Sequence, residues 1–309
     1  MYNKKMMAGL LSAGLLLVPN AAFAESTDVN LIVGNDYVQS DEAAGQVYIN
    51  DAGRTMIPLR LVSETMGYET NWQPDGSIQI TSADGTVDVT LQIDSTTYTA
   101  GGESGTFATA PTLKNDRAYL PARDFTDLYG SIYWDNDSRT VWIENGDAVT
   151  YRVLGNNLLR ADENGITPVT MPTGYEVSSL GKLDQVVNER VIDGTGYVAI
   201  NYDMNHSQQC PLFRDDGDQM TYIATINGSS SFWVEDDTLY YTAGIDAGPW
   251  SDYIDPNRLF IMTIGGESVS CDVGFAINAC TISVDGDVLT AKGADGVAHE
   301  INLSDCLFE

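Results

Sequence analysis

The sequence has little positive charge. Against 44 aspartates and glutamates it carries 15 lysines and arginines, which leaves a formal net charge of −29 at pH 7. Nucleic acids and anionic lipid surfaces are bound through cationic side chains, so this balance argues against both kinds of partner. An acidic surface suits an extracellular protein and attracts divalent cations. Calcium is therefore the one cofactor that we keep open, and no other cofactor is expected.

The sequence also lacks an apolar run long enough to cross a membrane. The longest, Ala8–Val18, is about half of the ~20 residues that a spanning helix needs. It follows Lys4 and Lys5 and precedes Ala22-Phe23-Ala24, a small-x-small cleavage site. Residues 1–24 are therefore predicted to be a signal peptide. The mature chain is expected to be secreted, and either released or held non-covalently outside the cell, for example at the cell wall.

Cysteines are few, and all four lie in the second half of the chain, at Cys210, Cys271, Cys280 and Cys306. An even number in a secreted protein permits two disulfides, with three ways of pairing them. Free buried thiols are the alternative, and the sequence does not choose between the two. The spacing of the four residues matches no zinc-binding motif.

No catalytic signature is present. The chain contains no Gly-x-Ser-x-Gly elbow, no His-Glu-x-x-His and no phosphate-binding loop. The many acids leave room for the paired carboxylates of a glycosidase, but nothing singles out a pair. His206 and Cys210 are spaced as His-x-x-x-Cys, and without a second close pair a surface histidine beside a structural cysteine is favoured over a metal site.

What the sequence does contain is one pattern used twice. The first copy has Arg54, Pro58, Arg60, Gly67 and Trp72, followed by Ile78 and Ile80. The second copy has Arg117, Pro121, Arg123, Gly130 and Trp134, followed by Val141 and Ile143. The spacing is 63 residues throughout (117 − 54, 121 − 58), except for the tryptophans, which are 62 apart (134 − 72). A gapped coincidence of this length indicates one supersecondary unit that occurs twice.

Each copy is expected to form a strand, a short helix and a hairpin. Pro58 and Pro121 suit the first turn of a helix, and Gly67 and Gly130 stand where a left-handed cap belongs. Helices this short need support from a sheet, so we expect antiparallel strands to pack against them in one core. The recurrence of the two tryptophans at matched positions favours core packing for both rings.

The pattern resembles the copper amine oxidase N-terminal domain, also called the stalk domain, over residues 28–146. The resemblance implies an α+β module of extracytoplasmic bacterial proteins, often of the cell envelope. In the oxidases this module lies away from the copper centre, so the resemblance implies neither copper nor oxidase activity. Asn201-Tyr202-Asp203 is similar to the tripeptide that supplies the quinone cofactor of these enzymes. Copper there needs three histidines, and this chain has two, His206 and His299, so a strand end is favoured.

Residues 150–309 follow a different sequence pattern, in which short apolar and aromatic runs alternate with Gly, Asn and Asp turns. Such runs include Gly196–Ile200, Met220–Ile226, Thr238–Thr242 and Arg258–Thr263. This pattern predicts an all-β domain, either propeller-like or a sandwich. Several turns are rich in aspartate, at residues 135–137, 215–218, 236–237 and 285–287. Hairpin turns explain these aspartates better than calcium loops do.

Aromatic side chains give the best indication of binding. Trp250 and Tyr253 lie in a Gly-Pro-containing loop that could stack against a glycan.

Taken together, the sequence predicts a secreted, non-enzymatic bacterial envelope protein. Its stalk-type module would attach or position a β-domain that binds wall glycan or another envelope protein. The alternatives are a secreted carbohydrate-active hydrolase, with its site in the second domain, and a pure spacer.

Overall fold

The computed structural model describes most of the chain beyond its N-terminal segment. The described residues are 29–41, 44–85, 88–144, 148–177, 187–200, 210–227, 232–242 and 255–306. The predicted signal peptide, residues 1–24, lies outside them and stays a prediction. Within the described residues the strands form seven sheets and are accompanied by two short α-helices. Neither of these helices is long and apolar enough to cross a membrane.

Each copy of the repeat folds into a strand, a short helix and a hairpin. The first copy consists of β4 (Thr55–Pro58), α1 (Leu59–Thr65), β5 (Glu69–Trp72) and β6 (Ser77–Thr81). The second consists of β11 (Arg117–Pro121), the 3-10 turn η1 (Ala122–Phe125), α2 (Thr126–Tyr129), β12 (Ser131–Asp135) and β13 (Thr140–Glu144). The same order of elements in both copies confirms the predicted duplication.

Strands β4 and β11 relate the two copies by a local two-fold arrangement. They pair antiparallel, with Ile57 opposite Leu120. Leu120 is the counterpart of Ile57 in the repeat (120 − 57 = 63), so each residue faces its own equivalent. Both side chains are fully buried. The two helices also meet, because the hydroxyl oxygens of Ser63 and Tyr129 lie 2.6 Å apart. The two copies therefore share one core.

The repeated prolines end strands and do not begin helices. Pro58 is the last residue of β4 and precedes α1, and Pro121 stands in the same way before η1. The prediction of a proline inside the first helical turn is therefore wrong by one residue. The reason is that Pro58, with φ of −65° and ψ of 118°, continues the strand that pairs with the other copy. Gly67 and Gly130 follow the helices with positive φ angles of 81° and 123°.

The remaining strands of the module complete three sheets around this core. β3 (Tyr48–Ile49) and β10 (Thr112–Lys114) flank the β4–β11 pair. β7 (Asp88–Gln92), β8 (Thr97–Ala100) and β9 (Glu103–Thr106) extend the β5–β6 hairpin. β1 (Asn30–Val33) and β2 (Asp36–Val38) extend the β12–β13 hairpin. β1 runs parallel to β13, so the prediction of antiparallel strands is wrong for this pair. A connection as long as the module can bring a strand in from either direction.

Beyond residue 148 four sheets follow one another, each built from consecutive strands. The first contains β14 (Thr150–Leu154), β15 (Asn157–Asp162) and β16 (Gly165–Val169). The second contains β17 (Val187–Ile192), β18 (Thr195–Ile200), β19 (Cys210–Asp215) and β20 (Met220–Ile226). The third contains β21 (Phe232–Glu235), β22 (Thr238–Tyr241), β23 (Arg258–Thr263) and β24 (Ser268–Asp272). The fourth contains β25 (Cys280–Asp285), β26 (Val288–Gly293) and β27 (Ala298–Asn302), flanked by the 3-10 turns η3 (Ile277–Ala279) and η4 (Leu303–Asp305).

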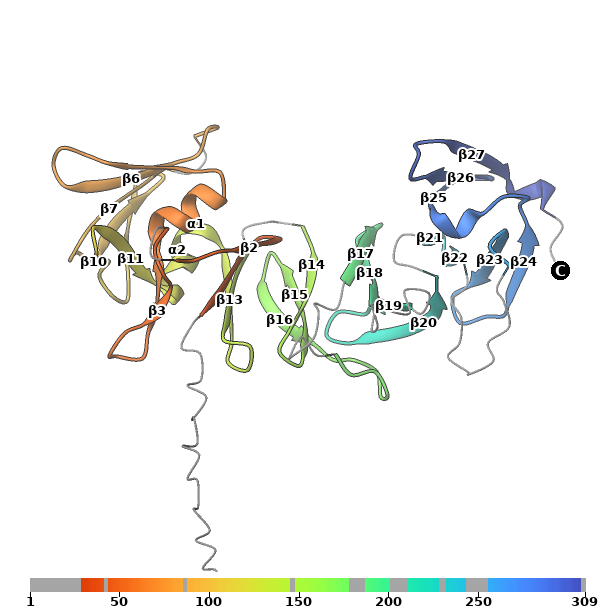
Figure 1. Ribbon diagram of the computed structural model, residues 1–309, viewed down its shortest axis with the longest axis horizontal. Helices are drawn as coiled ribbons and strands as arrows, with labels where there is room; N and C mark the ends of the chain where they lie inside the picture. Colours follow the sequence, from red (N-terminus) through yellow and green to blue (C-terminus); the bar gives the residue numbers. More distant parts are fainter. Residues whose placement is uncertain are drawn as a thin grey trace, which may run out of the picture.

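Neighbouring sheets of this series pack face to face, so the inner strands contribute to two cores. On β18, Tyr197 and Ala199 join a core shared with the β21–β24 sheet. Val198 and Ile200 point the other way, into a core shared with the β14–β16 sheet. Successive residues of a strand alternate between faces, which explains why strands buried on both sides read as continuous apolar runs. Figure 1 shows the sheets following one another from β14–β16 to β25–β27.

The first layer of the series belongs to the duplicated module. Ile32 of β1 and Trp142 of β13 point away from the module's own core, and we call this pair the Trp142 face. It packs on three residues of the next sheet, Leu154, Leu159 and Ala161. The carbonyl oxygen of Gly34 accepts a hydrogen bond from Nε1 of Trp142 at 3.2 Å and another from Arg152 at 3.1 Å. The module and the following sheets are thus joined by a buried apolar core.

Candidate functional site

A groove of about 710 Å³ opens on the first copy of the repeat, where residues of α1, the β5–β6 hairpin and the β10–β11 turn line it. Trp72, the last residue of β5, lines this groove and is 45% exposed. Arg60 of α1 and Arg117 of β11 line it as well. The groove therefore brings together repeat residues from both copies, and we call it the Trp72 groove.

The rim of the Trp72 groove is held by tight backbone geometry. Asn115 and Asp116 have positive φ angles of 49° and 59°, as in the two-residue turns that suit β-hairpins. Arg117 donates from Nη1 to the carbonyl oxygen of Asn115 at 3.3 Å. On the other side Gly45, with φ of 108°, comes so close that an added Cβ would lie 3.0 Å from Cδ of Arg117 and 3.0 Å from Cβ of Pro58. Glycine is needed here because both the φ angle and the space exclude a side chain.

The polar groups of the groove retain hydrogen-bonding capacity. Arg60 donates from Nη2 to the carbonyl oxygen of Thr70 at 3.2 Å, and its Nε lies 3.6 Å from a carboxylate oxygen of Glu64. A guanidinium has five N–H donors, so these contacts do not exhaust it. Thr70 is 8% exposed, and its Oγ1 has no hydrogen-bond partner among the described residues. A buried hydroxyl without a partner is costly in a folded protein, and Thr70 lines the groove.

The matching tryptophan of the second copy lies in a different environment. Trp134 is partly buried and packs against the shared core. Each ring lies opposite an equivalent residue of its hairpin, Trp72 opposite Ile78 and Trp134 opposite Val141. The prediction of core packing therefore holds for Trp134 and is wrong for Trp72. The two rings occupy the same place in the repeat, but in the first copy the space beside the ring is left open as the groove.

The other arginines of the repeat lie outside the Trp72 groove. Arg54 and Arg123 are exposed. Asp124, which follows Arg123, is buried and accepts a hydrogen bond from the backbone N–H of Ala108 at 2.7 Å. Burial raises the pKa of the Asp124 carboxyl. The repeat residues thus divide into those that build the scaffold and those that line the groove, a distinction that their spacing did not reveal.

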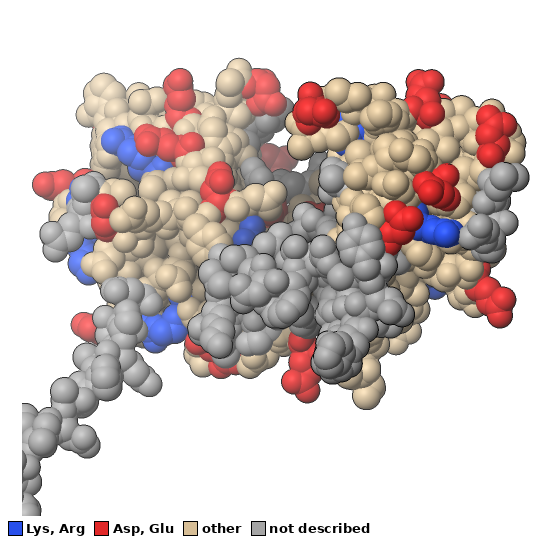
Figure 2. Space-filling model, turned by 45° about the vertical axis from the view of Figure 1, so that its right-hand side comes forward, with Lys and Arg blue, Asp and Glu red and all other residues tan. Residues whose placement is uncertain are grey.

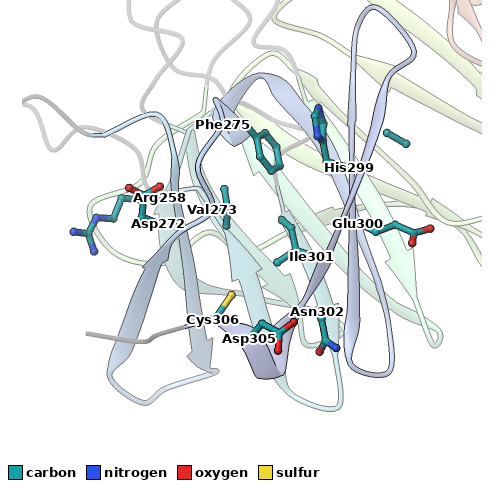
Figure 3. A pocket seen from close by; sticks show the side chains of 11 residues that line it. Arg258, Asp272, Val273, Phe275, His299, Glu300, Ile301, Asn302, Asp305 and Cys306 are labelled. Atoms are coloured by element: carbon teal, nitrogen blue, oxygen red, sulfur yellow. The ribbon is translucent and has the colours of Figure 1, made fainter.

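A second groove, of about 800 Å³, lies at the far end of the chain (Figure 3). The rings of Phe275 and His299 stack there with centroids 4.2 Å apart. Three acids, Asp272, Glu300 and Asp305, also line it, which makes it the place to look for the carboxylate pair of a hydrolase. Figure 3 shows Glu300 pointing away from the other two, and Asp272 accepts a hydrogen bond from the backbone N–H of Gly274 at 2.7 Å. The described geometry therefore does not favour that reaction at this groove.

None of the four cysteines, all of them in the described part of the chain, forms a disulfide in this structure. Cys210 lies in the core between the second and third sheets of the series, whereas Cys271 and Cys280 lie in the core between the third and fourth. Burial, together with a hydrogen bond to Cys306, raises the pKa of the Cys271 thiol to about 12. The contact favours a bond between Cys271 and Cys306, whereas Cys210 and Cys280 lie in different cores. Disulfide formation itself stays a prediction.

A buried polar cluster lies between the first two sheets of the series. The Tyr151 hydroxyl donates to the carboxylate of Asp215, which Arg160 also approaches, with 3.1 Å between Nε and Oδ2. The backbone N–H of Tyr151 donates to Glu189 at 2.5 Å. Burial raises the pKa of the Glu189 carboxyl to about 7. None of these residues lines either groove described above, so we interpret the cluster as structural.

Aspartates of two described turns bond to backbone groups of their own turns. Among the residues that the structure describes, no three His, Cys, Asp or Glu side chains gather in a way that could hold a metal ion. Asp135 instead accepts the backbone N–H of Ser138 at 2.7 Å, and Asp215 accepts that of Gly217 at 2.8 Å. These carboxylates cap their own turns, as expected for hairpins. Calcium binding stays a prediction.

Several predicted sites fall outside the described residues. These are Trp250 and Tyr253, the proposed stacking pair, as well as His206 and the tripeptide Asn201-Tyr202-Asp203. The groove at Trp72 was missed because its tryptophan is a repeat residue, and recurrence alone suggested the core.

Comparison with known proteins identifies the first half of the chain. A search of curated proteins gives no match. A streptogramin B lyase structure is similar at 12% sequence identity over 76% of this chain and 68% of that chain, with a TM-score of 0.24, which is too low to carry an argument about the fold. The family model of the copper amine oxidase N-terminal domain matches residues 32–143. In copper amine oxidases this domain is non-catalytic. The duplicated scaffold built around Ile57 and Leu120 therefore matches the copper amine oxidase N-terminal domain family.

Proposed function

We propose that this chain is a secreted, non-enzymatic bacterial envelope protein that its duplicated module attaches to cell-wall glycan. One observation carries the proposal, and it is the different use of the two copies. The second copy buries its Trp142 face under the following sheets. The first copy instead leaves a groove open beside an exposed tryptophan. A module of a non-catalytic family thus has one copy that holds the rest of the molecule and one that is available to a partner.

The second half serves, in this proposal, as the part that is presented away from the attachment point. Each of its four sheets is a meander of consecutive strands, which is the connectivity of propeller blades. We therefore favour a propeller-like series over a sandwich. Acidic side chains are spread over the visible face of the molecule and basic ones are few, which suits solubility outside the cell (Figure 2).

Retention on purified cell wall tests the attachment. The mature chain, without residues 1–24, is incubated with sedimented wall at low salt, and the bound fraction is measured against an unrelated acidic protein of similar size. We expect the chain to sediment with the wall and the control to stay in solution. Equal behaviour of the two proteins would contradict attachment. Release of new reducing ends from the wall by the purified chain would contradict the non-enzymatic part of the proposal.

A further inference from the structure

We propose that the Trp72 groove is a saccharide-binding site for a short glycan of uncharged pyranose rings. The inference rests on the proposed attachment function, to which it adds a site and a class of ligand. It is built on three features of the groove: an exposed aromatic ring, a balanced set of donors and acceptors, and a buried hydroxyl without a partner.

The exposed ring is suited to a sugar. Trp72 offers an apolar face that is 45% exposed at the side of a concave surface. A pyranose ring has a face of C–H groups that can stack on an indole, while its hydroxyls remain at the rim for hydrogen bonds. Leu59 and Ile78 also border the groove, but both are fully buried, so Trp72 supplies the apolar surface that is open to a ligand. Few but well-placed polar groups beside an apolar surface are typical of small-ligand sites.

The polar groups of the groove can both donate hydrogen bonds to hydroxyl groups and accept hydrogen bonds from them. Arg60 and Arg117 donate hydrogen bonds, whereas Glu64 and Asp116 accept them. Since the two positive and two negative side chains balance, the groove does not select a charged ligand by its own charge. The hydroxyl of Thr70 can either donate or accept, and among the described residues nothing occupies it. A ligand rich in hydroxyl groups offers both donors and acceptors to these side chains.

The charge of the whole chain argues against polyanionic polymers as ligands of the groove. With a net charge of −29, the protein repels polyanions at long range. The groove's own net charge of zero does not compensate for this repulsion. A protein partner is also disfavoured, because protein interfaces centre on a larger buried apolar patch. Around Trp72 the neighbouring side chains at the rim are charged or polar, as in Arg60, Glu64 and Asp116.

The experiment compares matched variants of the two copies. Wild type, Trp72→Ala, Arg60→Ala and their second-copy controls Trp134→Ala and Arg123→Ala are tested for binding to soluble oligomers of N-acetylglucosamine, glucose and mannose by calorimetry. Each variant is also tested for retention on purified wall. Circular dichroism confirms that the variants are folded. We expect at least one oligomer to bind the wild type, Trp72→Ala to weaken this binding at least about tenfold, and Arg60→Ala to weaken it less. Both controls should bind as the wild type does.

The possible outcomes separate this inference from the proposed function. If the wild type is retained on wall and Trp72→Ala is retained equally, attachment stands and the groove is not its site. If an oligomer binds through Trp72 while the wall retains nothing, the saccharide site stands and wall attachment fails. Binding of none of the oligomers, or binding only of a polyanion or of a protein, overturns the inference.

Discussion

The two copies of the repeat have the same order of elements and different surroundings. In the second copy the outer face of the hairpin carries Trp142, which is 1% exposed and packed under the following sheet. The equivalent residue of the first copy is Gln79 (142 − 79 = 63), which is only partly buried and bonded to Gln73 and Asp88. The core-facing residues beside them remain alike, with Ile78 and Ile80 in one copy and Val141 and Ile143 in the other.

The inward face of each hairpin must match the shared core, so it keeps its apolar residues. The outward face is under no such requirement and can be either covered by another sheet or solvated. Trp142 is covered in this way, whereas Gln79 is not.

The largest expected effect comes from giving the second copy the residue of the first. Trp142→Gln removes a buried indole and its hydrogen bond to Gly34, and it leaves a polar amide in an apolar core. We expect a loss of about 3–5 kcal/mol in the free energy of unfolding. Chemical denaturation followed by far-ultraviolet circular dichroism measures it, and limited proteolysis shows whether the second half separates from the module.

The reverse exchange is the control. Gln79→Trp places an indole on the face that the following sheets do not cover, so the free energy of unfolding should change by no more than about 0.5 kcal/mol. If both substitutions cost the same, the two faces do not differ in the way described above.

Next in size is a test of the shared core. Ile57→Ala and Leu120→Ala each remove a fully buried side chain, and each should cost about 2–4 kcal/mol. Because these residues face each other across the pair of strands, their losses should be similar and should not add in the double variant. Additive losses of unequal size would show that the copies do not share one core.

Much of the fold that the two copies share could be predicted from the sequence. The residues that recur in the repeat are of types that each favour one kind of local structure. Proline, glycine and the apolar pairs recur wherever the chain turns or faces the core. The use of each copy could not be predicted, because it depends on contacts between residues far apart in the chain. Trp142 docks on Leu159, and Trp72 lines a groove with Arg117, 45 residues away (117 − 72).

The contact between the first two sheets of the series should make the stability of the chain depend on pH. Glu189 of β17 has a pKa raised by burial to about 7, with Tyr151, Arg152 and the second copy's Glu144 as its neighbours. The native state therefore binds a proton more tightly than the unfolded state, so this contribution to stability is complete below about pH 4.5 and is lost as the pH rises through 7. Glu189→Gln keeps an acceptor for the N–H of Tyr151 and does not titrate.

The expected result for Glu189→Gln is a gain of about 1–2 kcal/mol at pH 8 and no gain at pH 4, after allowance for the partial exposure of the carboxyl. Thermal unfolding of both proteins between pH 4 and pH 8 measures it. A parallel shift of the variant at all pH values would mean that Glu189 has the same pKa in the native and unfolded states.

The smallest expected effect concerns the two tryptophans that the repeat made look equivalent. Trp72 is 45% exposed, whereas Trp134 is partly buried against the core. Trp134→Ala should therefore cost about 1–2 kcal/mol of unfolding free energy, and Trp72→Ala about 0.5 kcal/mol or less. Denaturant titrations of the two variants side by side would resolve the difference. If Trp72→Ala proved the more destabilising, its ring would be part of the scaffold, and any loss of glycan binding in that variant would follow from the damaged fold. If Trp72→Ala instead changes the free energy of unfolding little, the first copy keeps a large aromatic side chain where stability does not require one.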